Sequence, residues 1–150
     1  MKIVVFGSTG KTGREVVYQA LERGYTVTAY ARNPKKPDIT HPNLNVVSGE
    51  LSDRDAIKAA IHGADCVISA LGPYFSVHDT ALSDGMKNIL STMKECGINR
   101  IVQLSTISSA DPNDRKDFRA KLLVGMVKRS YADGYAESRW RVLNIFAKLL

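Results

Sequence analysis

Residues 2–13 read KIVVFGSTGKTG, an apolar run followed by a glycine-rich turn. The run over residues 2–6 lacks the alternation of polar and apolar residues, which is typical of a strand covered on both faces. Gly7, Gly10 and Gly13 follow at intervals of three residues. In a strand–turn–helix unit the first glycine permits the tight turn, the second lets the backbone approach a pyrophosphate, and the third lets the helix pack closely on the strand. The stretch therefore predicts a dinucleotide-binding turn.

The predicted turn offers several groups to an anion. Free N–H groups and the dipole at the start of a helix attract phosphates. The hydroxyls of Ser8, Thr9 and Thr12 are expected to add donors. A Walker A loop is excluded, because Gly10-Lys11-Thr12 has no glycine five residues before Gly10. The alternative is a tight turn between a strand and a helix that binds nothing.

Strand and helix signals alternate along the rest of the chain. Helices are predicted over residues 11–23, 53–62 and 80–96, and further helical stretches over 115–129 and 135–148. Strands are predicted over residues 2–6, 25–31, 45–48, 65–70 and 100–105. Ser52 is expected to be the N-cap of the second helix. The alternation predicts an α/β fold of Rossmann type, a doubly wound parallel sheet of five strands in the order 3-2-1-4-5 with a helical C-terminal tail.

Length and charge bound the remaining possibilities. A chain of 150 residues is expected to form one domain, with a βαβ core over 1–110 and a basic helical tail over 115–150. The net charge of +6 falls entirely in that tail, which is most simply a solvated helical face, and no nucleic-acid-binding module is found. No membrane span, signal peptide or metal-ligand spacing is found either. We expect a cytoplasmic protein whose two cysteines are reduced.

The end of the second predicted strand indicates which dinucleotide is bound. An Asp or Glu there would bind the 2′-hydroxyl of NAD, but this chain reads Tyr30-Ala31-Arg32-Asn33-Pro34. The Arg32 guanidinium can pair with a 2′-phosphate and stack on adenine. The sequence therefore favours NADP(H) over NAD(H), with an ordinary exposed loop cation as the alternative.

Other strand ends are expected to complete the site, since ligands bind at the carboxyl ends of strands in such sheets. Glu50, after the third strand, is placed to approach adenine, and Gly72, after the fourth, permits close approach of the nicotinamide half. Ser105 and Thr106, after the fifth, are candidates to hydrogen-bond the carboxamide or a substrate carbonyl. The alternative is that they only cap the strand end.

Five blocks of sequence together resemble the atypical short-chain dehydrogenases/reductases, in the NAD(P)H-binding, NmrA-like branch that includes biliverdin reductase B and flavin reductases. They are GSTGKTG, ARNP, VVSGEL, VISALG and DGMKNILSTMKECGINRIVQLST, starting at residues 7, 31, 46, 67 and 84. The resemblance implies an NADP(H)-dependent oxidoreductase that transfers hydride to flavin or a related planar acceptor. An NmrA-like redox sensor that binds NADP(H) without turnover, and acts through a protein partner, is the alternative.

By position, the resemblance also implies a set of site residues. Those of the pyrophosphate turn are Gly7, Thr9, Gly10, Lys11, Thr12 and Gly13. Arg32 would bind the 2′-phosphate, Glu50 and Leu51 the adenine, and Leu71 and Gly72 the nicotinamide ribose. Ser105 and Thr106 match the active-site serine region and are the candidate catalytic residues.

The chain departs from the family at three places. Glu50 stands where the family usually has Asp. The Tyr-x-x-x-Lys pair of ordinary short-chain dehydrogenases is missing, as is common in this branch, since Tyr131 is followed four residues later by Tyr135. The family's last strand, which ends in Arg-Pro, has no counterpart in residues 139–146, so a C-terminally shortened form is expected. Residues 135–150 are expected to form an apolar, basic helix. It would pack on the sheet edge or, in a homodimer, on a second copy of the chain; the rival is a helix on a membrane surface.

Overall fold

The computed structural model describes residues 1–33, 39–72 and 81–104. Nearly all of them belong to one compact unit, Met1–Pro73 with Asp84–Leu104, which is the fold described below. A second unit, Tyr74–Ser83 with Ser105–Leu150, contributes only residues 81–83 to the described part. The helices expected after residue 115 lie outside the described residues.

Strands and helices follow one another as the sequence pattern predicts. The strands are β1 (Lys2–Phe6), β2 (Thr26–Ala31), β3 (Leu44–Ser48), β4 (Cys66–Ser69) and β5 (Ile101–Gln103). The helices are α1 (Lys11–Glu22), α2 (Arg54–Ile61) and α3 (Ala81–Glu95). Each begins and ends within two residues of its predicted boundaries. All strand pairs are parallel and the order is β3-β2-β1-β4-β5, so the predicted Rossmann-type sheet is confirmed.

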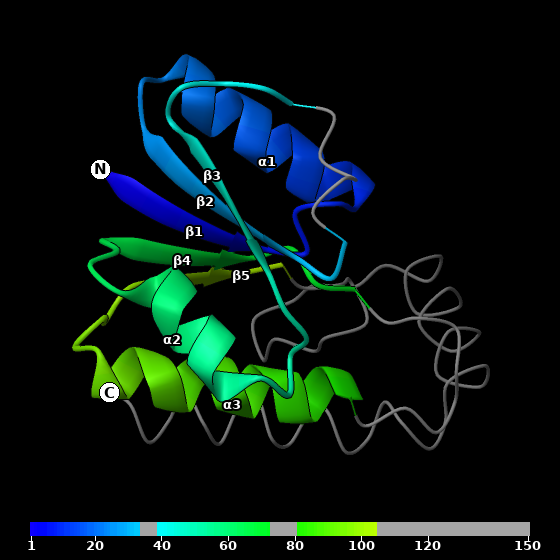
Figure 1. The fold of residues 1–150 in the computed structure, drawn as a ribbon, viewed down its shortest axis with the longest axis vertical. Coiled ribbons are helices and arrows are strands. Elements are labelled where there is room, and N and C mark those ends of the chain that lie inside the picture. Colours follow the sequence, from blue (N-terminus) through cyan, green and yellow to red (C-terminus); the bar gives the residue numbers. More distant parts are fainter. Residues whose placement is uncertain (34–38, 73–80, 105–150) are drawn as a thin grey trace, which may run out of the picture. The chain divides into compact units, whose positions relative to one another are not determined.

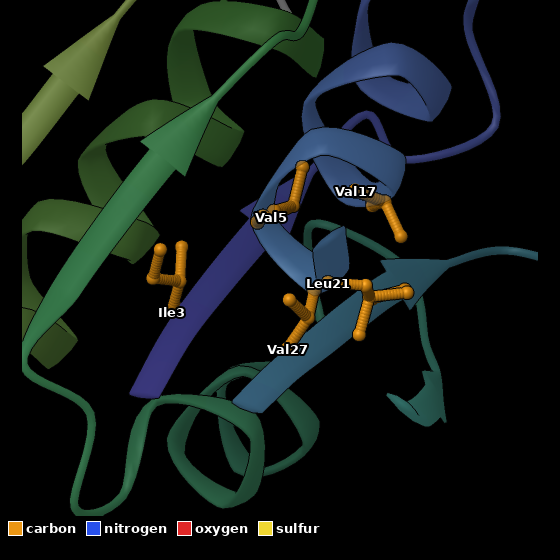
Figure 2. Close-up of a cluster of buried hydrophobic side chains, with 7 residues drawn as sticks. Ile3, Val5, Val17, Leu21 and Val27 are labelled. Atoms are coloured by element: carbon orange, nitrogen blue, oxygen red, sulfur yellow. The ribbon is translucent and has the colours of Figure 1, made fainter. Parts of the chain in front are cut away.

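Helices cover both faces of the sheet, with α1 on one side and α2 and α3 on the other (Figure 1). This explains the unbroken apolar run of β1, because side chains on both faces of that strand are buried. Ile3 and Val5 of β1 pack with Val27 of β2 against Val17 and Leu21 of α1 (Figure 2). Burial of such a side chain contributes about 1.5–3 kcal/mol, so this contact fixes α1 on the sheet.

The opposite face of the sheet carries the aromatic pair Phe6 and Tyr30, which are paired in register between β1 and β2. Their ring centroids lie 4.8 Å apart, with the rings tilted by 44°. Phe6 immediately precedes the glycine-rich turn, so this pair lies next to the start of that turn.

The N-cap predicted for α2 is wrong by one residue. Asp53, not Ser52, is the cap, and its carboxylate accepts a hydrogen bond from the Ala56 N–H at 2.9 Å. The reason is the preceding turn, in which the Asp53 N–H donates to the Glu50 carbonyl at 3.0 Å and places Asp53 in the extended conformation of a cap.

Within the three described ranges, none of the helices has the length and apolar character needed to cross a bilayer.

Candidate dinucleotide site

The candidate site lies at the carboxyl end of β1, the strand at which the sheet order reverses. β1 pairs with β2 on one side and with β4 on the other, and Phe6 lies opposite both Tyr30 and Ser69. In open α/β sheets, the crevice at such a reversal is where ligands bind. The glycine-rich turn predicted from the sequence begins at this point.

Gly7 makes the tight turn that the sequence predicts. Its φ is +76°, a conformation that residues other than glycine rarely adopt. A Cβ atom here would lie 2.8 Å from the carbonyl carbon and oxygen of Ala70 and 2.9 Å from the Leu71 nitrogen. The turn therefore passes directly against the end of β4, and glycine is required there by the protein itself.

Gly13 is also required by packing. A Cβ atom at this buried position would lie within 3 Å of the Gly7 carbonyl group and only 2.0 Å from its oxygen. The missing side chain lets the first turn of α1 rest on the backbone of the glycine-rich turn. Its predicted role, close packing of the helix, is what the structure shows.

Gly10 differs from its two neighbours in the motif. Its backbone is extended, with φ −75° and ψ 163°, a conformation open to any residue. Among the described residues, a Cβ atom would meet only the Gly7 oxygen, at an ordinary contact distance of 3.4 Å. Nothing in the described fold requires glycine at this exposed position, which suits a backbone that a ligand approaches closely.

The start of α1 is electrostatically suited to an anion. Gly10 is the N-cap and supplies no side-chain cap, and the first turn has no acidic residue. At α2, by contrast, Asp53 caps the helix and Asp55 lies in the first turn. Thr9, Lys11 and Thr12 are all exposed around the start of α1. The first turn of α1 thus supplies no carboxylate of its own to its positive dipole end.

Ser8 does not offer its hydroxyl to a phosphate, so this expectation is wrong. Its side chain is buried, and its Oγ donates to the Tyr30 carbonyl at 2.9 Å. The strand ends at Phe6 and the chain turns at Gly7, and after this turn the Ser8 hydroxyl lies against the backbone of β2. Ser8 instead links the glycine-rich turn to that strand.

Tyr30 supports the loop that carries Glu50. Its hydroxyl donates to the Glu50 carbonyl at 2.8 Å. Burial, assisted by the charges of Asp53 and Glu50, raises the pKa of Tyr30 to about 12. The phenol therefore remains a donor at neutral pH. The sequence marked Tyr30 only as a strand former; the alternation along β2, which puts it on the face of Phe6, is the signal that could have revealed this role.

Leu51 is held from the other side, by α3. The side-chain amide of Asn88 donates to the Leu51 carbonyl at 2.9 Å. The Leu51 side chain lies against Gly85, where a Cβ atom would come within 2.7 Å of it. The two residues expected at the adenine thus have both carbonyl groups fixed, while the Glu50 side chain is exposed.

Arg32 lies at the carboxyl end of β2, and the residues predicted for the nicotinamide half, Leu71 and Gly72, lie just beyond the carboxyl end of β4. Arg32 directly follows β2, is exposed, and has a carbonyl that accepts from the Ser48 hydroxyl at 3.4 Å. No acidic residue occurs in β2 or at Arg32 and Asn33. Leu71 is half-buried and Gly72 exposed, just beyond β4. Ser105 and Thr106 lie outside the described residues.

The described residues contain no cluster of three or more His, Cys, Asp or Glu side chains that could hold a metal ion. Both cysteines are free, and burial raises the pKa of the Cys66 thiol. The candidate site offers backbone N–H groups, hydroxyls and basic side chains, and this set of donors suits phosphate groups.

The fold and this edge of the sheet together define a dinucleotide-binding domain of the α/β class. The chain matches the NAD(P)H-binding family over residues 7–140, and it belongs to that family. The membership predicted from the sequence blocks is confirmed at this level.

Among characterised relatives, cinnamoyl-CoA reductase 1 of Arabidopsis thaliana is 32% identical over 124 residues, which cover 74% of this chain and 36% of that protein. The solved oxidoreductase ylbE from Lactococcus lactis matches with a TM-score of 0.69 at 22% identity, over 95% of this chain and 62% of that one. ChuY, an anaerobillin reductase from Escherichia coli O157:H7, matches with a TM-score of 0.64 at 21% identity, over 87% and 63% of the two chains. The chain thus spans about a third of the length of its curated relative.

Proposed function

We propose that this chain is an NADP(H)-dependent oxidoreductase that transfers hydride to flavin or a related planar acceptor. The observation that carries the proposal is Gly10, an exposed glycine at an uncapped helix start that the described fold itself does not require. A pyrophosphate lying against Gly10 would account for the missing side chain and for the missing carboxylates. A small-molecule substrate and a cytoplasmic location belong to the same proposal.

The preference for NADP(H) over NAD(H) rests on the end of β2. Arg32 is exposed there, and neither β2 nor the two residues after it include an acid that would repel a 2′-phosphate. A guanidinium can meet a phosphate with two parallel charge-assisted hydrogen bonds. Glu50 and Leu51, on the neighbouring loop, would contact the adenine.

The chain's own residues bind and orient the two reactants. When bound, the nicotinamide supplies the hydride, so the protein needs no nucleophile for that step. Leu71 and Gly72 would lie along the nicotinamide ribose, and Ser105 and Thr106 would hydrogen-bond the carboxamide or the acceptor's carbonyl. Two similar proteins are named as reductases, a cinnamoyl-CoA reductase and an anaerobillin reductase, and these names support the reductase part of the proposal.

Steady-state oxidation of NADPH tests the proposal, with FMN and with a quinone as acceptors. We expect turnover with at least one of them and a lower KM for NADPH than for NADH. Tight NADPH binding without turnover on any acceptor would instead favour the redox-sensor function. Absence of binding to either nucleotide would contradict both functions.

A further inference from the structure

Tyr30 is hydrogen-bonded to both parts of the candidate site. Its backbone carbonyl accepts from the Ser8 hydroxyl at 2.9 Å, and its own hydroxyl donates to the Glu50 carbonyl at 2.8 Å. Ser8 is only 1% exposed and Tyr30 only 3%. One residue thus connects the glycine-rich turn to the loop between β3 and α2.

The loop is shaped around the phenol. A Cβ atom at Gly49 would lie 2.2 Å from the Tyr30 hydroxyl oxygen and 2.9 Å from the ring carbon that bears it. The Glu50 carbonyl accepts from the Asp53 N–H as well, at 3.0 Å. The phenol therefore occupies the space that a side chain at Gly49 would need, and it shares its acceptor with the turn that starts α2.

The aromatic ring provides a second connection. The Tyr30 ring packs on Phe6 with centroids 4.8 Å apart, and Phe6 immediately precedes Gly7. Removing only the hydroxyl would leave this packing in place and take away only the hydrogen bond from Tyr30 to the Glu50 carbonyl. The two functions of the side chain can therefore be separated by a single substitution.

We propose that Tyr30 is a positioning residue that holds the glycine-rich turn and the Glu50–Leu51 loop in one register, so that a single adenosine 2′,5′-bisphosphate group can contact both. The inference rests on the proposed cofactor site and adds a residue that makes no contact with the cofactor. Without the phenol hydroxyl, part of the loop would have to be ordered when the ligand binds, and affinity would fall accordingly.

The test measures binding of three ligands to wild type and to Tyr30→Phe by calorimetry and competition. The ligands are NADPH, adenosine 2′,5′-bisphosphate and inorganic pyrophosphate. We expect the Kd of the two adenine-containing ligands to rise about five- to tenfold, as loss of one buried hydrogen bond implies. The Kd of pyrophosphate, which would contact the turn alone, should stay unchanged. Tyr18→Phe, at a tyrosine of α1 that is 52% exposed, is the matched control.

A second variant checks the same connection from its other end. Ser8→Ala should also weaken the binding of adenosine 2′,5′-bisphosphate. The double variant should lose no more affinity than the weaker-binding single variant, because each change breaks the same connection between the turn and the loop. Additive losses, or a folded Tyr30→Phe protein that binds the bisphosphate as wild type does, would overturn the inference. Equal weakening of all three ligands would overturn it as well, because it would indicate general loosening. If wild type binds none of them, the proposed function fails and the inference fails with it.

Discussion

The proposed preference for NADP(H) depends on Arg32. Replacing it with alanine would remove a charge-assisted contact with the 2′-phosphate, and we expect NADPH affinity to fall by roughly 2–3 kcal/mol. NADH has no 2′-phosphate, so its affinity should change little. Titrations of both nucleotides measure the effect. Arg23→Ala is the control, because Arg23 caps the opposite end of α1. Equal affinity of wild type for NADPH and NADH would contradict the assignment.

The buried phenol of Tyr30 makes a prediction about stability and pH. Its pKa is about 12 in the folded protein, against 10.0 ordinarily. Between these values the unfolded chain loses the proton while the folded chain keeps it. The contribution of the protonated phenol to the free energy of unfolding is therefore complete below pH 10, and it is lost as the pH rises toward 12.

Urea unfolding of wild type and Tyr30→Phe at several pH values measures this contribution. We expect the stability advantage of wild type over Tyr30→Phe to shrink by about 1 kcal/mol between pH 9 and pH 11. The variant cancels the titration of lysines and of the other tyrosines, which both proteins share. Parallel pH curves would show that the phenol ionises normally in the folded state.

At the scale of elements, the contact between α1 and the glycine-rich turn depends on Gly13. A Cβ atom there would lie 2.0 Å from the Gly7 oxygen, so α1 would have to move away from the backbone beneath it. We expect Gly13→Ala to destabilise the fold by about 1–3 kcal/mol, the usual range for overpacking. Thermal unfolding without ligand measures this loss. Gly24→Ala is not a suitable comparison, because the φ of Gly24 is +75° and any side chain there would strain the backbone. Gly10→Ala is the better control and should unfold like wild type.

The elements themselves could be predicted from the sequence because their signals are local. The apolar run of residues 2–6, the apolar face of α1 and the glycines between elements are patterns of residues that lie close together in the sequence. The parallel strand order then follows from the handedness of βαβ units. The glycine-rich turn could be predicted for the same reason, because its three glycines lie within seven consecutive residues.

The remaining features depend on contacts between segments that are distant in the chain. Ser8 and Tyr30 are separated by 22 residues, and Tyr30 and Glu50 by 20. The register of β1 against β2 brings Ser8 to Tyr30, and the register of β2 against β3 brings Tyr30 to Glu50. The N-cap of α2 was missed for a smaller reason of the same kind, because Ser52 and Asp53 are both good caps and the Glu50–Asp53 turn selects between them.

At the scale of the whole molecule, the apolar residues of the tail predict self-association. Residues 115–150 carry the net positive charge, and 135–150 include Trp140, Leu143, Ala147 and Leu150 at helical spacing. The helix predicted there would need a partner surface, and contact with a second copy would bury two such faces at once. We expect a homodimer that dissociates when residues 136–150 are deleted.

Light scattering over a range of protein concentrations, with and without anionic vesicles, measures this association. Binding of the monomer to vesicles would favour the membrane-surface alternative. A monomer that ignores vesicles, and whose stability is the same without residues 136–150, would contradict both.

Calorimetric titration of NADPH into wild type and into Gly10→Val tests most directly whether the dinucleotide lies against the glycine-rich turn. The backbone of Gly10 is extended, and a Cβ atom there would lie 3.4 Å from the Gly7 oxygen, so the described fold has room for the Cβ atom of a larger residue. The branched side chain would instead occupy the space of the pyrophosphate. We predict that wild type binds NADPH and that Gly10→Val, with an unchanged melting temperature, does not bind it. A folded Gly10→Val protein with the wild-type Kd would show that the cofactor lies elsewhere.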